Sequence, residues 1–421
     1  MKVFKLGGAS ISTIDRIKSA ASLIKQYQGE KLLLIISAMG KTTNALEKVS
    51  EAFYASNKAE ALSLFNEIKN SHIEVASQLQ TSNLQSQIPG YLQNYFTEVE
   101  WLLHDKPVRD YDYYYDQVVC TGELLSTSLI SNYFNADGIK NTWVDVRDIL
   151  RTDNNFREAR VDIDFTNKRI TEALLPLFDK TNLIITQGFI GSTDENESTT
   201  LGREGSDYSA ALFANMLNAD SLTIWKDVEG VMSADPKAFK DAKFINALSY
   251  EEVIEMAYYG AQVIHPKTIK PLQNESIPLY VKCFLQPDLP GTTIDNKPAS
   301  GLPPIIVEKS NQVLMQLSSK DYSFVGEKPI STLYKIFAEL RIKPNLTQNG
   351  AISLSLCFDD QQEKIEALAL AASDLFNVHL QKGLTLLTVR HYTSEILTKL
   401  LDNKTIMLEQ RTPQTVQFLL K

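Results

Sequence analysis

The stretch Thr199-Thr200-Leu201-Gly202-Arg203-Glu204-Gly205-Ser206-Asp207-Tyr208-Ser209-Ala210 decides how the rest of the chain is interpreted. It places two glycines, a guanidinium, a hydroxyl and a carboxylate just before a helical pattern. Gly202 and Gly205 allow close backbone approach and positive φ, and the free N–H groups of a helix that begins near Ser206 attract an anion. Arg203 can hold a carboxylate or a phosphate through two parallel hydrogen bonds. The stretch predicts an anion-binding loop, with a simple helix cap as the alternative.

The N-terminal segment carries a second signal for a phosphate site. Residues 3–6 have the pattern of a short buried strand, which Gly7 and Gly8 stop, and apolar residues then recur at helical spacing. A strand, a glycine turn and a helix together can hold phosphate. Lys5, at the end of the strand, could bring its ammonium to phosphate oxygens. The alternative is a plain turn with a solvated lysine.

Three more candidate residues follow apolar segments or begin them. The run 32–36 is typical of a parallel strand buried on both faces, and it ends in a loop of small and hydroxylated residues that includes Ser37 and Thr43. These residues either bind a ligand at the carboxyl end of the sheet or cap the next helix. Glu123 stands at the head of an apolar helical stretch. There it either pairs with a substrate ammonium or interacts only with the helix dipole.

A second lysine stands at the end of a later strand. Residues 221–225 predict this strand, which leads into Lys226, Asp227 and a turn at Asp235-Pro236. Phosphoryl transfer depends mostly on positioning and on neutralising the charge that spreads over phosphate oxygens. Lysines at two strand ends are therefore the charge arrangement that a phosphoryl-transfer site needs.

The order of the predicted elements indicates the fold class. Strand-like and helical segments alternate up to a boundary region at 286–304, which is rich in proline and glycine. This alternation predicts an α/β domain with a mostly parallel sheet sandwiched by helices. Beyond the boundary the pattern is that of a smaller α+β region. We expect a catalytic domain at 1–300, an α+β unit at 301–381, and a second, incomplete unit of the same kind at 382–421.

Composition and charge limit the classes of partner. The formal net charge of the 421 residues is -9, which argues against general binding to nucleic acid or to an anionic membrane surface. The three cysteines are widely spaced and predict neither a disulfide framework nor a zinc site. Neither a signal peptide nor an apolar run of about 20 residues is present. We therefore expect a cytoplasmic protein whose partners are small molecules or proteins.

The segments described above, taken in order, resemble aspartate kinases of the amino-acid-kinase family. The similar segments are Lys5–Ser10, Ser37–Asn44, Thr121–Glu123, Thr199–Ala210, Lys226–Pro236 and Tyr259–Pro266. The resemblance covers nearly the whole chain, and the C-terminal region is similar to the small ligand-sensing ACT units of these enzymes. It implies phosphorylation of the side-chain carboxylate of L-aspartate by ATP with Mg²⁺, giving 4-phospho-L-aspartate in the first step of lysine, threonine and methionine biosynthesis. It also implies a homodimer formed through the ACT-like region, and leaves room for an amino-acid effector.

The resemblance further implies a role for each matched residue. Lys5 would neutralise the transferring phosphoryl group, and Asp207 would orient this lysine and the metal-bound phosphates. Glu123 would bind the ammonium of aspartate and Arg203 its α-carboxylate. The full set of expected aspartate-binding residues is Ser37, Thr43, Glu123, Arg203 and Ser206. The expected nucleotide contacts are Lys5, Gly7, Gly8, Lys226, Asp227, Met232, Lys237 and Gln262. No residue is expected to bind the metal directly, and no general base is required because a carboxylate is already a nucleophile at neutral pH.

Three features depart from the family pattern. Glu204 stands where the family usually has glycine and adds a negative charge beside the phosphates. Gln262 stands where many members have lysine, and the second ACT-like unit lacks a returning helix and strand. Two alternatives therefore stay open: another amino-acid kinase, such as one acting on glutamate, and a weakened kinase that acts as an amino-acid sensor. The pairing of Glu123 with Arg203 favours an α-amino acid over a nucleotide as the phosphate acceptor.

Overall fold

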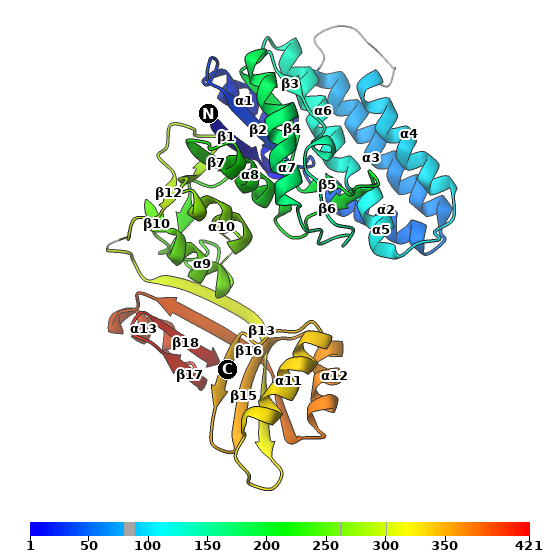
Figure 1. Cartoon of the computed structure of the whole chain (residues 1–421). Coiled ribbons are helices and arrows are strands. Elements are labelled where there is room, and N and C mark those ends of the chain that lie inside the picture. Colours follow the sequence, from blue (N-terminus) through cyan, green and yellow to red (C-terminus); the bar gives the residue numbers. More distant parts are fainter. Residues whose placement is uncertain (80–88, 262, 300) are drawn as a thin grey trace. The chain divides into compact units, whose positions relative to one another are not determined.

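The structure is a computed structural model that describes residues 1–79, 89–261, 263–299 and 301–421 (Figure 1). These residues form two compact units that alternate along the chain. The first unit contains 1–231, 246–254 and 263–299, and the second contains 232–245, 255–261 and 301–421. Two short segments before residue 300 therefore pack with the C-terminal region. Each unit has its own sheet and is described separately below.

The first unit is built on an eight-stranded sheet with the order β10-β12-β11-β7-β1-β2-β4-β3. Neighbouring strands are parallel except for β11 and β12, which are antiparallel. This confirms the predicted mostly parallel sheet. The strands are β1 (Lys2–Leu6), β2 (Leu32–Ile36), β3 (Thr142–Trp143), β4 (Leu183–Gln187), β7 (Ser221–Lys226), β10 (Ala247–Ser249), β11 (Leu279–Cys283) and β12 (Thr292–Asp295).

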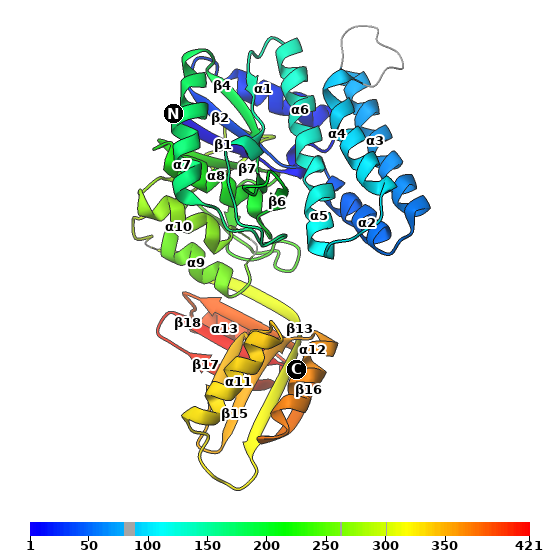
Figure 2. The same ribbon diagram turned by 45° about the vertical axis from the view of Figure 1, so that its right-hand side comes forward.

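Helices cover both faces of this sheet (Figures 1 and 2). Helix α8 contacts β1, β2 and β7 and packs against α10, whereas α6 contacts β2, β3 and β4. The helices of the unit are α1 (Ile14–Lys25), α2 (Thr42–Tyr54), α3 (Lys58–Leu79), α4 (Gly90–His104), α5 (Tyr111–Val119), α6 (Thr121–Ala136), α7 (Ile163–Arg169), α8 (Gly205–Met216), α10 (Pro266–Asn274) and the first turn of α9 (Tyr250–Tyr258).

The alternation of side chains along β1 explains how this strand serves both the core and the site. Phe4 and Leu6 are buried in the large apolar cluster that also contains residues of α1 to α6. Because successive side chains of a strand point to opposite faces, Lys5 points to the other face, where its ammonium contacts Asp207 of α8. The apolar residues of β1 therefore anchor the strand that carries the lysine.

The carboxyl ends of the central strands lie side by side. The register pairs Leu6, the last residue of β1, with Ile36 of β2 and Trp225 of β7. The loops that follow these three strands therefore leave the sheet at the same edge. This edge is where an open α/β sheet binds its ligands.

The second unit is built on a six-stranded antiparallel sheet with the order β14-β15-β13-β16-β18-β17. Helices α11 and α12 pack on one apolar cluster of this sheet, and α13 packs on another. The elements are β13 (Ile305–Ser319), α11 (Glu327–Glu339), β14 (Leu346–Asn349), β15 (Ser353–Asp359), α12 (Gln362–Ala372), β16 (Phe376–Arg390), α13 (Ser394–Leu401), β17 (Ile406–Arg411) and β18 (Thr415–Leu420). The second unit also contains the short pair formed by β8 (Val231–Met232), from its second residue, and β9 (Phe244–Ile245).

The two long strands run through both halves of this C-terminal sheet. The first half of β13, Ile305–Lys309, pairs with the second half of β16, while the last residues of β13 pair with the first half of β16. A β-bulge between Lys309 and Leu314 separates the two halves. Residues at the start of β13 therefore extend the sheet of the second ACT-like unit. The predicted boundaries of the two C-terminal units, and that of the catalytic domain, stay a prediction.

Candidate active site

A buried ion pair lies at the centre of the candidate site. Lys5 Nζ is 2.7 Å from Asp207 Oδ1, and both side chains are largely buried, with 12% and 7% of their surface exposed. Burial alone would raise the pKa of Asp207, but the positive charges of Lys5 and Lys226 outweigh it and hold this pKa below its usual range. The structure therefore brings together the two predicted catalytic residues and one of the predicted nucleotide-binding lysines.

Glu123 lies in the first turn of α6 and is almost completely buried, with 2% of its surface exposed. Its Oε1 accepts a hydrogen bond of 3.2 Å from Ala38 N, whereas Oε2 has no hydrogen-bond partner within the described residues. Burial raises the pKa of Glu123 to about 8, against the lowering effect of the Ala38 hydrogen bond and of the Lys5 charge. A buried carboxylate oxygen without a donor is costly, so this side chain has the chemistry to receive an ammonium group.

The loops after β1 and β2 pack closely against each other and are joined by a hydrogen bond. A Cβ on Gly8 would lie 2.5 Å from Ala38 O, and Gly40 N donates a 3.0 Å hydrogen bond to Gly8 O. Only glycine permits this approach without movement of the backbone. A Cβ on Gly7 would meet Lys5 Nζ at 3.4 Å, so both predicted glycines lie against other parts of the site.

Ser37 and Thr43 occupy the loop and helix that follow β2. Ser37 N donates to Leu6 O over 3.1 Å, and Ser37 O accepts from Ser126 Oγ of α6 over 2.8 Å. Thr43 lies in the first turn of α2 and is partly buried. The Ser126 contact, together with the Ala38–Glu123 hydrogen bond, fixes the β2 loop to the first turn of α6. Ser126 was missed in the sequence analysis, although it follows Glu123 by one helical turn.

The predicted anion-binding loop has a left-handed backbone at Gly202 and at a glutamate, whereas Gly205 begins α8 and does not have a positive φ. Gly202 has φ 73° and Glu204 has φ 55°, both in the left-handed region. Glu204 is the N-cap residue of α8, and its buried Oε2 has no hydrogen-bond partner within the described residues. Arg203 is exposed, and Ser206 lies buried in the first turn of α8. The loop thus presents the free guanidinium beside the helix N-terminus.

His265 has a structural role as a helix cap. It is the N-cap of α10, and its Nδ1 accepts a 3.1 Å hydrogen bond from Lys267 N. Burial lowers the pKa of His265, while the negative charge of Glu204 opposes this effect. Glu204 therefore lies close enough to α10 to interact with its cap.

The predicted nucleotide-binding residues fall into three groups. Lys226 ends β7 and donates a 2.8 Å hydrogen bond to Val263 O, and Asp227 pairs with Arg16 Nη1 at 3.7 Å. Met232 and Lys237 belong to the second compact unit. Gln262 lies outside the described residues. The positive charge of Lys226 acts on Asp207, which Lys5 contacts, and the nucleotide-binding roles of all these residues stay predictions.

Side chains that commonly bind metal ions are not clustered at the site within the described residues. Within the described part of the chain, no group of three or more His, Cys, Asp or Glu side chains could hold a metal ion. The Asp207 carboxylate is already engaged by Lys5. Mg²⁺ commonly binds through substrate phosphates with few protein ligands. The binding of Mg²⁺ together with the nucleotide stays a prediction.

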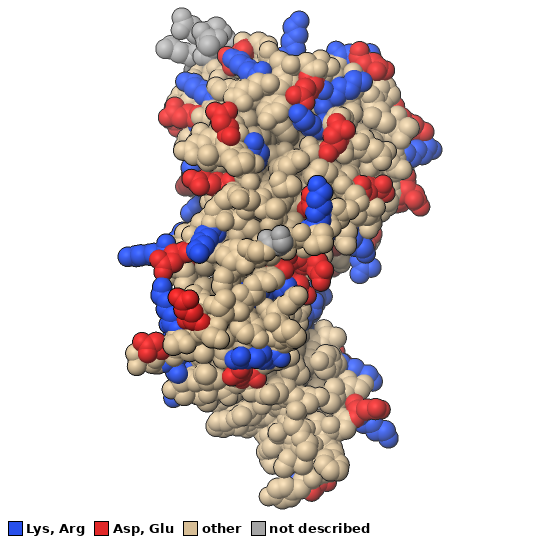
Figure 3. All heavy atoms as spheres, turned by 90° about the vertical axis from the view of Figure 1, so that its left-hand side faces the viewer, with Lys and Arg blue, Asp and Glu red and all other residues tan. Residues whose placement is uncertain are grey.

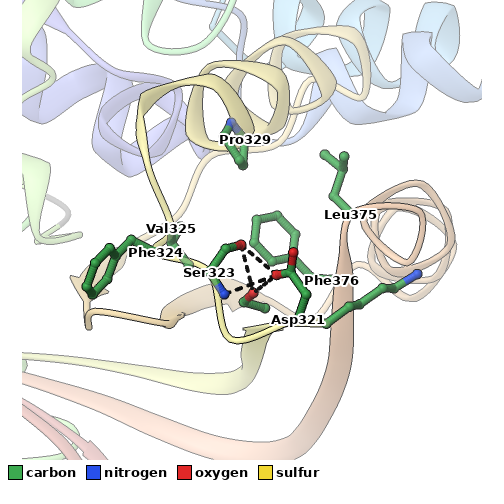
Figure 4. A pocket seen from close by; sticks show the side chains of 9 residues that line it. Asp321, Ser323, Phe324, Val325, Pro329, Leu375 and Phe376 are labelled. Atoms are coloured by element: carbon green, nitrogen blue, oxygen red, sulfur yellow. Dashed lines mark hydrogen bonds between the residues drawn. The ribbon is translucent and has the colours of Figure 1, made fainter.

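A separate hollow of about 240 Å³ lies in the second unit. Figure 4 shows Asp321 at its wall, with Leu375, Phe376 and Pro329 around the opening. Asp321 Oδ1 accepts hydrogen bonds from Ser319 Oγ, from Ser323 N and from Ser323 Oγ, at 2.6 to 3.0 Å. Hydrogen bonds lower the pKa of Asp321 to about 2, and those from Ser323 have the largest effect. This hollow combines a fixed carboxylate with apolar walls.

Charged side chains of both signs are mixed on the surface. On the face shown in Figure 3, Lys and Arg side chains are interspersed with Asp and Glu side chains. Among the described residues, no helix has both the length and the apolar character to cross a membrane.

Comparison with known proteins agrees with this geometry. Residues 1–283 match the model of the amino acid kinase family. The chain is 30% identical to the lysine-sensitive aspartokinase 3 of Escherichia coli over 403 residues, which cover 92% of this chain and 86% of that protein. It is also 30% identical to the chloroplastic aspartokinase 1 of Arabidopsis thaliana, over 92% of this chain and 70% of that protein.

Solved structures give the same result. The crystal structure of E. coli aspartokinase III in complex with aspartate and ADP matches with a TM-score of 0.83 and 27% identity, over 100% of this chain and 96% of that one. The same enzyme in complex with lysine and aspartate matches with a TM-score of 0.79 and 28% identity, over 100% and 95%. The chain therefore belongs to the amino acid kinase family. Within this family it groups with the aspartokinases.

Proposed function

We propose that this chain transfers the γ-phosphoryl group of ATP to the side-chain carboxylate of L-aspartate, as the first step of the aspartate-derived amino-acid pathway. The observation that carries the proposal is the buried, unpartnered Oε2 of Glu123, which lies at the same sheet edge as the Lys5–Asp207 pair. An α-amino acid supplies the ammonium that this oxygen lacks. The similarity to aspartokinases of known substrate supports aspartate as that amino acid.

Two charged groups hold the substrate in this proposal. Glu123 accepts hydrogen bonds from the α-ammonium, and Arg203 binds the α-carboxylate through two parallel bonds. Ser37, Thr43 and Ser206 supply hydroxyl groups on the loops and helix starts around them. With both α-groups fixed, the side-chain carboxylate is the free nucleophile. Such positioning converts the reaction into an effectively unimolecular one.

The lysines act on the phosphoryl group. An oxygen of the side-chain carboxylate attacks the γ-phosphorus, the bond to the β-phosphate oxygen breaks, and ADP leaves with the electron pair. Lys5, held by Asp207, stabilises the charge on the transferring group, and Lys226 adds positive charge nearby. Mg²⁺, bound with ATP, supplies further neutralisation of the phosphate charges. Gly7, Gly8 and Asp227 keep their predicted nucleotide contacts, as do Met232, Lys237 and Gln262.

Two variants test these roles. Lys5→Ala should abolish turnover while aspartate binding, measured by calorimetry, stays within about threefold of the wild type, because Lys5 acts mainly on charge that develops in transfer. Arg203→Ala should instead raise the KM for aspartate by about a hundredfold, because it removes a bidentate bond to the substrate. A Lys5→Ala enzyme with a near-normal kcat would refute the catalytic assignment.

Regulation forms the second part of the proposal. We place an amino-acid effector in the hollow around Asp321, where the carboxylate can bind an ammonium and Phe376 and Leu375 can contact an aliphatic chain. The E. coli relative has been solved with lysine bound, which supports an amino-acid effector. Inhibition by lysine, threonine and methionine should be titrated separately. Asp321→Ala should raise the concentration that gives half inhibition and leave the uninhibited rate unchanged.

Assembly and compartment complete the proposal. Tyr322, Phe324 and Leu370 expose 82%, 80% and 75% of their surface in the first ACT-like unit. Large exposed apolar side chains on one unit favour an interface between subunits. We therefore propose a homodimer through this region, which sedimentation analysis can test. The cysteines are free and buried, which suits a reducing cytoplasm.

A further inference from the structure

A buried carboxylate that the catalytic roles do not use lies beneath the substrate loop. Asp116, on α5, has 0% of its surface exposed. Its Oδ2 accepts hydrogen bonds from Thr200 N over 2.8 Å and from Arg157 N over 2.9 Å. Its Oδ1 accepts a third hydrogen bond, of 2.7 Å, from Thr200 Oγ1. One side chain therefore satisfies donors from two segments that are distant in the sequence.

Both of these segments lead to the turn that carries Arg203. Thr200 is the last residue of β6 (Ser198–Thr200), two positions before Gly202. The other segment packs against the same turn: Ala159 N donates a 3.0 Å hydrogen bond to Thr200 O, and a Cβ on Gly202 would lie 3.1 Å from Arg157 O. The strand before the turn and the loop behind it are thus both tied to Asp116.

We propose that Asp116 is a positioning residue for the aspartate-binding loop. Through its hydrogen bonds to Thr200 and to the Arg157 loop, Asp116 fixes the position of the Arg203 guanidinium. Removal of its carboxylate frees two main-chain N–H groups and one hydroxyl at the base of the turn. Arg203 itself is exposed, so its placement depends on the backbone beneath it. A displacement of about 1 Å at a binding group is enough to weaken substrate binding strongly.

The role depends on hydrogen-bond geometry rather than on negative charge. The charge of Asp112 on the same helix acts on Asp116, whereas the Arg157 side chain pairs with Asp112, with 3.1 Å between Nη1 and Asp112 Oδ1. An asparagine at position 116 can keep its carbonyl oxygen on the two N–H groups, and the Thr200 hydroxyl can rotate to accept from the amide. Burial raises the pKa of Asp116 to about 6, while the hydrogen bonds from Thr200 and Arg157 act in the opposite direction.

The test compares four variants in steady-state kinetics with both substrates. Asp116→Ala should raise the KM for aspartate by about tenfold or more, with kcat and the KM for ATP within about threefold of the wild type. Asp116→Asn should restore the KM for aspartate to within about threefold. Thr200→Val removes one of the three bonds and should lie between them. Asp110→Ala is the matched control and should leave all constants unchanged, because Asp110 is exposed just before α5 and makes no side-chain cap hydrogen bond.

Several results would overturn the inference. These are an unchanged KM for aspartate in Asp116→Ala, an equal rise in the KM values for both substrates, or an asparagine variant as impaired as the alanine variant. If Asp116→Ala does not fold, an unchanged KM for aspartate in Thr200→Val decides against it. The inference rests on the proposed role of Arg203. An Arg203→Ala enzyme with normal KM would refute that role alone, whereas a normal Asp116→Ala enzyme beside an impaired Arg203→Ala enzyme would refute only the positioning role.

Discussion

At the residue scale, the site depends on one carboxyl group that holds its proton at neutral pH. Burial raises the pKa of Glu123 from 4.5 to about 8 in the free protein. Below pH 8 the group is therefore mostly protonated and neutral. Binding of the aspartate ammonium favours the carboxylate form, so substrate binding must release a proton. Burial makes an unpaired oxygen of Glu123 costly. For the same reason, burial makes the pairing of Glu123 with the substrate ammonium strong.

The pH dependence of aspartate binding follows from this pKa. As pH rises from 6.5 toward 8 the KM for aspartate should fall, by up to about tenfold per pH unit, and it should level off near pH 8. Calorimetry at pH 7 in buffers of different ionisation enthalpy should show the release of roughly one proton. Glu123→Gln should raise the KM and remove its pH dependence. A wild-type KM that is constant across this range would contradict the assignment.

Glu204 carries two separable features, a left-handed backbone and a negative charge. Its φ of 55° is costly for a residue with a Cβ, by about 1 kcal/mol. Glu204→Gly should therefore be about 1 kcal/mol more stable to denaturant than Glu204→Ala, because both variants lose the charge and only the first loses the Cβ. Equal unfolding midpoints for the two variants would show that the turn bears no strain.

The effect of the Glu204 charge on ATP binding is measured by steady-state kinetics. If its carboxylate faces the nucleotide phosphates, both the glycine and the alanine variant should lower the KM for ATP relative to the wild type. An unchanged KM in both variants would show that the side chain faces away from the phosphates, toward the cap of α10.

At the element scale, the site is assembled by contacts between strand ends. The loops after β1 and β2 touch at Gly8, where a Cβ would lie 2.5 Å from Ala38 O. The Ala38 N–H in turn binds Glu123 of α6. A displacement of the β1 loop is therefore transmitted to Glu123, the residue that is proposed to bind the substrate ammonium.

Gly8→Ala tests this packing. The added methyl group must push the two loops apart, which should cost about 1–3 kcal/mol of stability and reduce kcat/KM by more than about tenfold. Gly90→Ala is the matched control, because no atom of the described residues lies within 4 Å of a Cβ at Gly90. Both stability, from denaturant unfolding, and activity should stay normal in the control. A fully active Gly8→Ala enzyme would mean that the two loops are not coupled.

The elements also show which features could be predicted from the sequence. Strand-end motifs are local, so the parallel sheet could be predicted from short segments, whereas the approach of Lys5 to Asp207 was implied only by the family resemblance. Asp116 could not be found in this way, because its donors lie 41 and 84 residues along the chain. The pairing of Ile305–Lys309 with β16 was missed for the same reason: strand partners at long range leave no local periodicity.

At the scale of the whole molecule, the chain alternates between its two units close to the predicted nucleotide-binding motif. The segment that begins at Lys226 passes into the second unit at Met232. Within that unit, Ile306 N of β13 donates a 2.7 Å hydrogen bond to Ser233 O. The buried Arg390 of β16 holds Glu255 of α9, with 2.8 Å between Nη1 and Oε2. Part of the predicted nucleotide-binding motif therefore packs with the regulatory sheet.

Arg390→Gln tests this arrangement. Loss of the buried Arg390 guanidinium, whose partner Glu255 is 40% exposed, should destabilise the protein by about 1 kcal/mol, and the KM for ATP should rise severalfold while the KM for aspartate changes little. Lys399→Ala is the control. Lys399 pairs with Asp241 in the same unit, but both side chains are exposed, so that pair should contribute little. Equal KM values for ATP in the wild type and Arg390→Gln would show that the Arg390–Glu255 contact does not affect nucleotide binding.

The most direct test of the whole account is the phosphorylation reaction itself. The purified chain is incubated with ATP, Mg²⁺ and L-aspartate, and the acyl phosphate is trapped with hydroxylamine. L-glutamate and UMP are tested in parallel. We expect aspartyl hydroxamate that depends on ATP, its loss in Lys5→Ala, and little product with the other two acceptors. The absence of aspartyl hydroxamate above the blank, with aspartate still bound, would contradict the proposed reaction and favour an amino-acid sensor. Product from glutamate instead would assign the site to another amino acid.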